Sequence, residues 1–173
     1  SSVLSLLYDM DAELANTQIM LQVAGRAQFG LGQYGAAVEA YEKMVDKEPG
    51  VAMSHFLLGR SYAANGQIDK AHEELQRALD IDASHYGAQW LRINLLRLDN
   101  KLAQASELLA QMPEELAQRP EVLVERGWLA MYQDDFTAAE AYFDKAFKAL
   151  PLSDVLVQLG IARWNAGNPE AAL

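Results

Sequence analysis

Cysteine is entirely absent from the 173 residues of this sequence. Its absence excludes disulfide bonds, thiol catalysis and thiolate metal sites in this chain. Long apolar runs are missing as well, since no stretch approaches the roughly 18 consecutive apolar residues that a membrane-spanning helix requires. The first residues show no charged-then-apolar pattern of a secretion signal. None of these absences identifies the compartment in which the protein works.

Basic residues are few, because 14 lysines and arginines stand against 24 aspartates and glutamates, which gives a net charge of −10. A chain this acidic repels a phosphate backbone, so nucleic acid is excluded as an expected ligand. Apolar residues make up 51% of the chain, enough to bury one face of each helix. We therefore expect a soluble acidic protein, with no membrane insertion of this segment.

Catalytic motifs are lacking too. The sequence contains no His-Glu-x-x-His, no Gly-x-Ser-x-Gly and no phosphate-binding loop. His55, His72 and His85 stand at unrelated places in the chain, and we expect them on the surface. Adjacent carboxylates such as Glu73 and Glu74 would point about 100° apart on a helix, which favours a solvated face. We expect no enzyme, no cofactor and no metal.

One glycine-rich segment imitates a nucleotide-binding motif. Residues 30–35 are Gly-Leu-Gly-Gln-Tyr-Gly, which matches the pattern G-x-G-x-x-G. That motif requires a preceding strand, and the residues before it show no alternation of apolar and polar side chains. Because Gly32 recurs as Gly66 and Gly167, we interpret the segment as a turn between two helices.

A repeated pattern organises the chain, and residues 52–83 show it most clearly. Leu58 and Gly59 are followed by Tyr62, then by a turn and by small and apolar residues at helical spacing (Asn65, Gly66, Ala71, Leu75, Ala78). This pattern predicts two amphipathic helices joined by a tight turn. A glycine inside a helix costs about 1 kcal/mol relative to alanine, so we expect Gly59 to permit close contact with a second helix at Ala71.

The same residue types recur one step before this segment and two steps after it, at Gly25, Gly32, Ala37, Tyr41, Pro49, Gly127, Phe136, Ala139, Phe143, Ala146 and Pro151. Each step is about 34 residues long, and a period of this kind resembles the tetratricopeptide repeat family. The resemblance covers residues 18–173. It implies an all-α fold, a right-handed superhelix (solenoid) of antiparallel helix pairs. About 4.5 repeats are expected, at residues 17–51, 52–85, 86–119, 120–152 and 153–173.

Helix bounds follow from the turn residues. Proline cannot continue a helix, so Pro49 ends the second helix of the first repeat. In the first repeat we expect helices at about residues 17–31 and 34–47. In the fourth and fifth repeats we expect helices at residues 121–132, 136–149 and 154–165.

Both ends of the chain carry apolar faces. In residues 1–16, apolar side chains at helical spacing predict a helix that is either a cap or the second helix of an earlier repeat (Val3, Leu7, Met10, Leu14). The fifth repeat stops at Leu173, inside its second helix. Because Leu156 and Leu159 would then lack a capping surface, we expect self-association through this open end.

The third repeat departs from the pattern. Strict counting by the repeat period places Arg92 where other repeats are apolar, and Ile93 where they have glycine. Because an unpaired guanidinium is costly to bury, we prefer a register shifted by one residue, with Trp90 largely buried and a turn shorter by one residue. In this register the second helix spans residues 103–112, and residues 114–119 form a longer connection.

Arginine is concentrated in the predicted first helices, whereas every lysine lies in a second helix or a turn. In the tetratricopeptide repeat family the first helices line a concave groove, so the resemblance implies an arginine-bearing groove inside an acidic shell. The groove residues expected from repeat position are Gln22, Arg26, Phe29, Met53, Phe56, Arg60, Val124, Trp128, Met131 and Trp164. The third repeat adds Leu91 and Leu95 in the shifted register, or Trp90, Asn94 and Arg97 in the strict one. The alternative is that these side chains pack inside the fold and that the arginines cover apolar helix surface.

The resemblance implies a protein-interaction scaffold that binds another protein or peptide with acidic and apolar residues. A chaperone-tail receptor is not expected, because no first helix carries the family's clamp lysine, and Gln22, Phe56 and Leu57 occupy clamp positions. The alternative is a structural spacer or self-assembling array without a groove ligand. The chain is also loosely similar to bacterial repeat arrays of cell-envelope and exopolysaccharide assembly systems. We expect it in the cytoplasm or, by preference, the periplasm.

Overall fold

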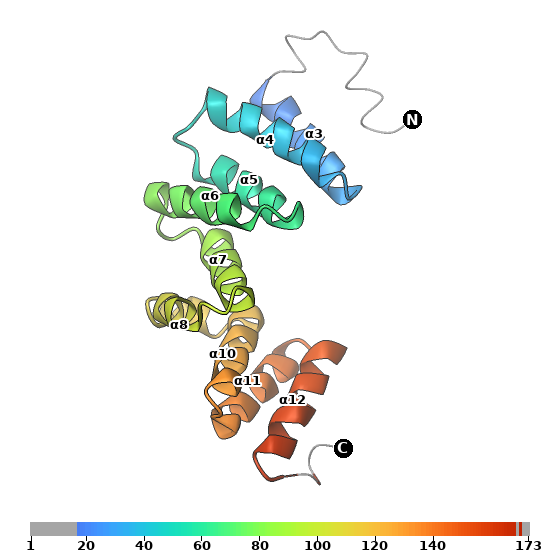
Figure 1. Cartoon of the computed structure of the whole chain (residues 1–173), viewed down its shortest axis with the longest axis vertical. Coiled ribbons are helices and arrows are strands. Elements are labelled where there is room, and N and C mark those ends of the chain that lie inside the picture. The colour runs from blue at the N-terminus through green and yellow to red at the C-terminus, as the bar shows by residue number, and fades with distance from the viewer. Residues whose placement is uncertain (1–16, 169, 171–173) are drawn as a thin grey trace. The chain divides into compact units, whose positions relative to one another are not determined.

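The computed structural model describes residues 17–168 and 170. This part of the chain contains ten helices and no strand (Figure 1). Their bounds are α3 Gln18–Gly30, α4 Tyr34–Lys47, α5 Ala52–Ala64, α6 Ile68–Ile81, α7 Tyr86–Leu98, α8 Leu102–Ala110, α9 Glu114–Ala117, α10 Pro120–Tyr132, α11 Phe136–Ala149 and α12 Ser153–Asn165. The all-α fold class is therefore confirmed. The helix predicted for residues 1–16 lies outside the described residues.

Successive helices form antiparallel pairs, because turns of only three residues join them. In the N-terminal half, residues 1–91, α3 packs on α4, α5 packs on α6, and α4 also contacts α5 (Figure 1). In the C-terminal half, residues 92–173, α11 contacts both α10 and α12, and α10 contacts α8 and α9. The boundary between these two compact halves falls inside α7.

The turns inside the helix pairs share one backbone conformation. Gly32, Gly66, Asn100 and Asp134 follow one another at one repeat period each, and their φ angles lie between 58° and 76°. This left-handed region suits glycine, and Asn and Asp tolerate it better than other residues do. Gly32 thus lies in the turn between α3 and α4, which confirms the interpretation of residues 30–35 as a turn.

Gly66→Ala is expected to destabilise the fold by about 1–2 kcal/mol, because the left-handed backbone is unfavourable for any residue with a Cβ atom. Gly35→Ala is the matched control. A Cβ atom at either position would meet nothing within 4 Å, but Gly35 lies in α4 with an ordinary helical backbone. Alanine there should stabilise the helix by about 0.5–1 kcal/mol. Urea denaturation measures both changes, and equal signs for the two variants would contradict the backbone explanation.

The third repeat keeps the strict register of the other repeats. Its helices α7 and α8 begin at Tyr86 and Leu102, one full period after the starts of α5 and α6, and the turn between them has the same length. The shifted register is therefore wrong, whereas most of the Trp90 side chain is covered, as predicted. The strict register is tolerated because Arg92 is only half-buried and the Gln89 amide donates to a backbone carbonyl at 2.7 Å. Within the predicted connection at residues 114–119, the one-turn helix α9 forms.

A glycine in the first helix lies in tight contact with the second helix of its pair. A Cβ atom on Gly59 would lie 3.0 Å from Leu75 Cγ and 3.2 Å from the carbonyl oxygen of Ala71. The predicted close approach of Gly59 to Ala71 is therefore confirmed. At Gly25 the space is smaller still, since a Cβ atom would lie 2.6 Å from Cζ of the fully buried Tyr41 ring.

A histidine and a carboxylate lie in the core of the N-terminal half. His55 and Glu74 are only 4% and 6% exposed, and His55 Nδ1 lies 2.7 Å from Glu74 Oε2. His55 Nε2 lies 2.9 Å from the carbonyl oxygen of Pro49, and Arg77 Nη1 donates to Glu74 Oε1 at 2.5 Å. The predictions of a surface His55 and a solvated Glu74 are wrong, because each side chain finds polar partners inside the fold.

Candidate protein-binding surfaces

Aromatic and arginine side chains meet on the first helices of the N-terminal half. The Arg60 guanidinium of α5 lies 4.3 Å from the ring centre of Phe29 on α3 and 5.9 Å from that of Phe56. All three side chains are half-buried. A cation stacked on an aromatic ring gains about 0.5–1 kcal/mol at an exposed site and keeps its charge. We call Phe29, Phe56 and Arg60 the N-terminal cluster.

Neighbouring rings hold the two phenylalanines of the N-terminal cluster in place. The ring centre of Phe29 lies 5.1 Å from that of Tyr34, edge to face, and the ring centre of Phe56 lies 4.8 Å from that of His85. A Cβ atom on Gly87 would meet the Phe56 ring at 3.0 Å, so Phe56 also packs against the start of α7. A surface that is already ordered loses little conformational entropy when a partner binds.

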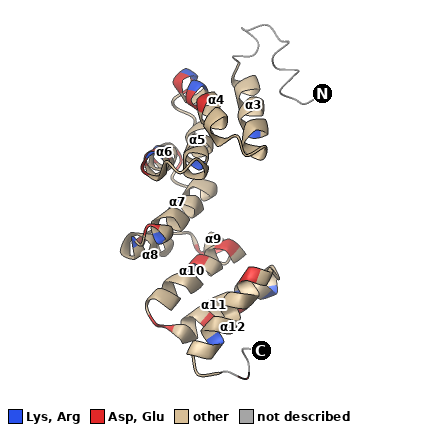
Figure 2. Cartoon of the chain, turned by 45° about the vertical axis from the view of Figure 1, so that its right-hand side comes forward, with Lys and Arg blue, Asp and Glu red and all other residues tan. Residues whose placement is uncertain are grey.

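Positive charge gathers beside the N-terminal cluster. Burial raises the pKa of the Tyr41 hydroxyl, whereas the charges of Arg60 and Arg26 lower it, so both guanidinium groups lie within electrostatic range of that hydroxyl. Arg26 is exposed, Met53 is 44% exposed, and Gln22 is half-buried. In Figure 2, α3 and α5 carry basic residues and no acidic ones, whereas α4 carries both signs. The first helices of this half thus offer positive and apolar groups together.

Trp128 lies with two other predicted site residues on α10 of the C-terminal half. Its ring centre is 5.3 Å from the Arg97 guanidinium and 6.0 Å, edge-on, from the Phe143 ring. Val124 and Met131 are half-buried and, like Trp128, pack against the core of this half. All three predicted site residues on α10 therefore pack partly inside the fold, which was the alternative to a groove position.

A buried carboxylate that the sequence analysis missed binds Arg97. Glu125 is 3% exposed, and it accepts hydrogen bonds from Arg97 Nε at 2.6 Å and from Asn94 Nδ2 at 2.9 Å. The sequence does contain a signal for this buried acid, because strict counting by the repeat period places Glu125 at the apolar position of Leu57. Leu95, a groove candidate of the shifted register, is 5% exposed and belongs to the core.

The last predicted site residue, Trp164 on α12, is 66% exposed. The same helix exposes three further apolar side chains by 43% to 57% (Leu156, Val157, Ile161). Leu159, expected at the open end, is instead 2% exposed and lies in the core. Arg163 on this helix is engaged by carboxylates, with Nε 3.1 Å from Glu140 and Nη2 3.5 Å from Asp144. α12 therefore presents an apolar face rather than a basic one.

Among the described residues, no group of three or more histidines and carboxylates is arranged to hold a metal ion. None of the described helices combines the length and the apolar character needed to cross a bilayer.

Solved structures of other proteins share this fold. MamA from Desulfovibrio magneticus RS-1 is 13% identical over 90% of this chain and 88% of its own, with a TM-score of 0.79. PilF from Pseudomonas aeruginosa is 18% identical over 88% of this chain and 69% of its own, with a TM-score of 0.78. A chain of the APC/C hetero-tetramer Cut9–Hcn1 is 17% identical over 96% of this chain but only 34% of its own, with a TM-score of 0.80. No curated protein sequence matches this chain.

Structural likeness at such low identity shows the fold but not the family. The family is shown by a sequence model that matches this chain. The model described as tetratricopeptide repeat matches residues 23–86, 56–120 and 124–173, which together make up most of the sequence. In the first four repeats, the turns and the starts of the paired helices show the same constant period. This chain therefore belongs to the tetratricopeptide repeat family.

Proposed function

We propose that this protein is an interaction scaffold that holds a segment of another protein on its first helices, with the N-terminal cluster as the main contact. Membership of the repeat family supports the general role of binding proteins. The specific surface rests on one observation, the stacking of the Arg60 guanidinium on Phe29 and Phe56. That arrangement offers an oriented cation and two aromatic rings at once.

A partner segment that carries acidic and apolar residues fits this surface best. Arginine binds carboxylates through two parallel hydrogen bonds, and aromatic residues, Met and Arg are enriched at the centres of interfaces. The rest of the chain is acidic, with a net charge of −10, so Arg26 and Arg60 form a local attraction for an acidic segment.

Replacing both Arg26 and Arg60 by Glu is expected to weaken binding of such a segment at least tenfold, because two attractive charges become repulsive. The ligand is a peptide selected from a random displayed library on the purified protein. Fluorescence polarisation at several salt concentrations measures its affinity. Added salt should weaken binding to the unchanged protein but not to the double variant, where it screens a repulsion.

The matched control is Lys43→Glu combined with Lys47→Glu, which changes the net charge equally but lies on α4, a second helix. It should change the affinity less than twofold. Circular dichroism should show unchanged helicity in both variants. If both double variants bind the selected peptide equally, the binding surface does not include the N-terminal cluster.

Self-assembly is the second candidate function, and the apolar face of α12 favours it. Leu156, Val157, Ile161 and Trp164 are each at least 43% exposed on this one helix. If this face joins copies of the chain, sedimentation should show concentration-dependent association that Trp164→Lys abolishes. A bacterial origin and a place in an envelope or exopolysaccharide system stay predictions, since likeness at 13% to 18% identity shows the fold alone.

A further inference from the structure

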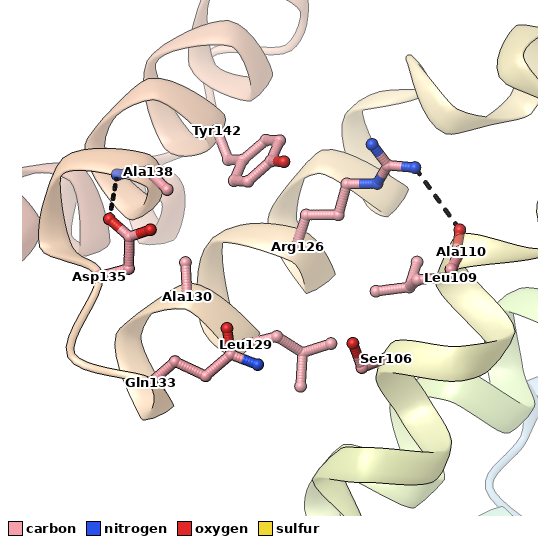
Figure 3. A pocket seen from close by; sticks show the side chains of 10 residues that line it. All are labelled: Ser106, Leu109, Ala110, Arg126, Leu129, Ala130, Gln133, Asp135, Ala138 and Tyr142. Carbon is pink, nitrogen blue, oxygen red and sulfur yellow. Dashed lines mark hydrogen bonds between the residues drawn. The ribbon is translucent and has the colours of Figure 1, made fainter.

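The C-terminal half contains a cavity that none of the predicted site residues lines. Its volume is about 340 Å³, and side chains of α8, α10 and α11 surround it (Figure 3). It is lined by Arg126, Leu129 and Ala130 of α10 and by Gln133, which directly follows that helix. Their spacing of three, four and seven residues places them on one side. Trp128 follows Arg126 by two residues, about 200° further round the helix. The cavity therefore opens on a different side of α10 from Trp128.

Arg126 supplies the positive charge in this cavity. Its side chain is half-buried, and Nη2 donates one long hydrogen bond, 3.5 Å, to the carbonyl oxygen of Leu109. A guanidinium has five N–H donors, so most of them are available to a ligand. Asp135 lies at the start of α11. Its Oδ1 accepts a hydrogen bond from the backbone N–H of Ala138 at 3.0 Å (Figure 3).

The wall between these two charged residues is apolar and made of leucine and alanine side chains. Leu109, Leu129 and Ala130 are 4%, 5% and 6% exposed, so their surfaces are firmly packed. Ala138 on α11 is half-buried and leaves room above them. Among the side chains drawn in Figure 3, Ser106, Gln133 and Tyr142 make no hydrogen bond with another drawn residue. The cavity thus combines the Arg126 cation at one side, the Asp135 carboxylate that caps α11 at the other, an apolar wall between them and polar side chains around it.

We propose that this cavity is a second docking site, which takes an aspartate or glutamate side chain of a partner polypeptide. The carboxylate would pair with the Arg126 guanidinium, and an adjacent apolar side chain would cover Ala130 and Ala138. A single charge-assisted contact holds a free small carboxylate only weakly, whereas in a polypeptide it adds to the contacts of neighbouring residues. The proposal does not depend on the N-terminal cluster, because that surface lies in the other half of the chain.

Nuclear magnetic resonance of protein labelled at the methyl groups of Ala, Leu, Val and Met tests the site. The probe is the capped pentapeptide acetyl-Ala-Leu-Glu-Leu-Ala-amide, and its matched control carries Gln in place of Glu. We expect the Glu peptide to shift the methyl signals of Leu109, Leu129, Ala130 and Ala138. The Gln peptide and free propionate should each bind at least tenfold more weakly.

Two variants test the charge of Arg126 and the open volume of the cavity separately. Arg126→Gln keeps a donor but loses the charge, and it should bind the Glu peptide no better than the Gln peptide. Ala138→Leu fills the cavity and should abolish the shifts with Arg126 unchanged. Lys148→Gln is the control, since it removes a charge from α11 at a side chain that is 73% exposed, and it should leave the affinity within twofold.

Four results would overturn the proposal. The first is the absence of shifts at the four cavity residues with the Glu peptide at millimolar concentration. The second is equal affinity of the Glu and Gln peptides for the unchanged protein. The third is shifts centred on Val124 and Met131 instead, which would assign the binding to the other face of α10. The fourth is propionate binding as tightly as the Glu peptide, which would make the cavity a small-carboxylate site.

Discussion

Replacing Gly127 by leucine is expected to lower the free energy of unfolding by about 3 kcal/mol or more, since overpacking of a filled core is strongly unfavourable. Even a Cβ atom on Gly127 would lie 2.7 Å from Cε1 and 2.8 Å from Cζ of Phe143. That ring is 0% exposed, so it has no solvent to move into. A larger side chain would force α10 and α11 apart. Urea denaturation followed by circular dichroism measures the loss.

A double variant tests whether the Phe143 ring is the cause. Gly127→Ala should cost about 2 kcal/mol by itself, because it makes only the first of these contacts. Adding Phe143→Leu would place at this contact the residue type that α6 has at Leu75, whose Cγ would lie 3.0 Å from a Cβ atom on Gly59. The double variant should therefore lose less stability than the two single variants add up to. Strictly additive losses would show that the two positions do not interact.

Arg97→Leu is expected to cost about 3–5 kcal/mol of stability, because it leaves the charge of Glu125 buried without its ion-pair partner. The side chains of Arg97 and Glu125 are 12% and 4% exposed, so water replaces the lost contact poorly. The hydrogen bond from Asn94 to Glu125 would remain, but it carries no compensating charge. Thermal and urea unfolding both measure the effect.

Two comparisons check this explanation. Changing Arg97 and Glu125 together to leucine should recover most of the stability, since no charge is then buried. Lys148→Met removes one partner of the exposed pair between Lys148 and Asp144, and it should cost less than about 1 kcal/mol. A loss equally small for Arg97→Leu would mean that Glu125 is solvated when Arg97 is absent.

The spacing of residues along the chain was enough to predict the repeat architecture. The second helices of the first and fourth repeats begin and end at the predicted residues, Tyr34–Lys47 and Phe136–Ala149. Gly59 contacts α6 at Ala71, as its place in the repeat predicts. These features depend on turn residues and on apolar side chains within a single repeat, so a local pattern contains the information for them.

Contacts between distant polar groups were decided only by the folded chain. Arg97 and Glu125 are 28 residues apart, and His55 and Glu74 are 19 residues apart, yet each pair forms a short buried contact. The sequence does not show such partners. An apparently unpaired Arg92 therefore favours the shifted register of the third repeat, and nothing in the sequence indicates that His55 and Glu74 are buried. The free energy of burying a charge depends on whether a partner from another helix reaches it. A repeat period positions the helices, but it does not specify which polar side chains meet between them.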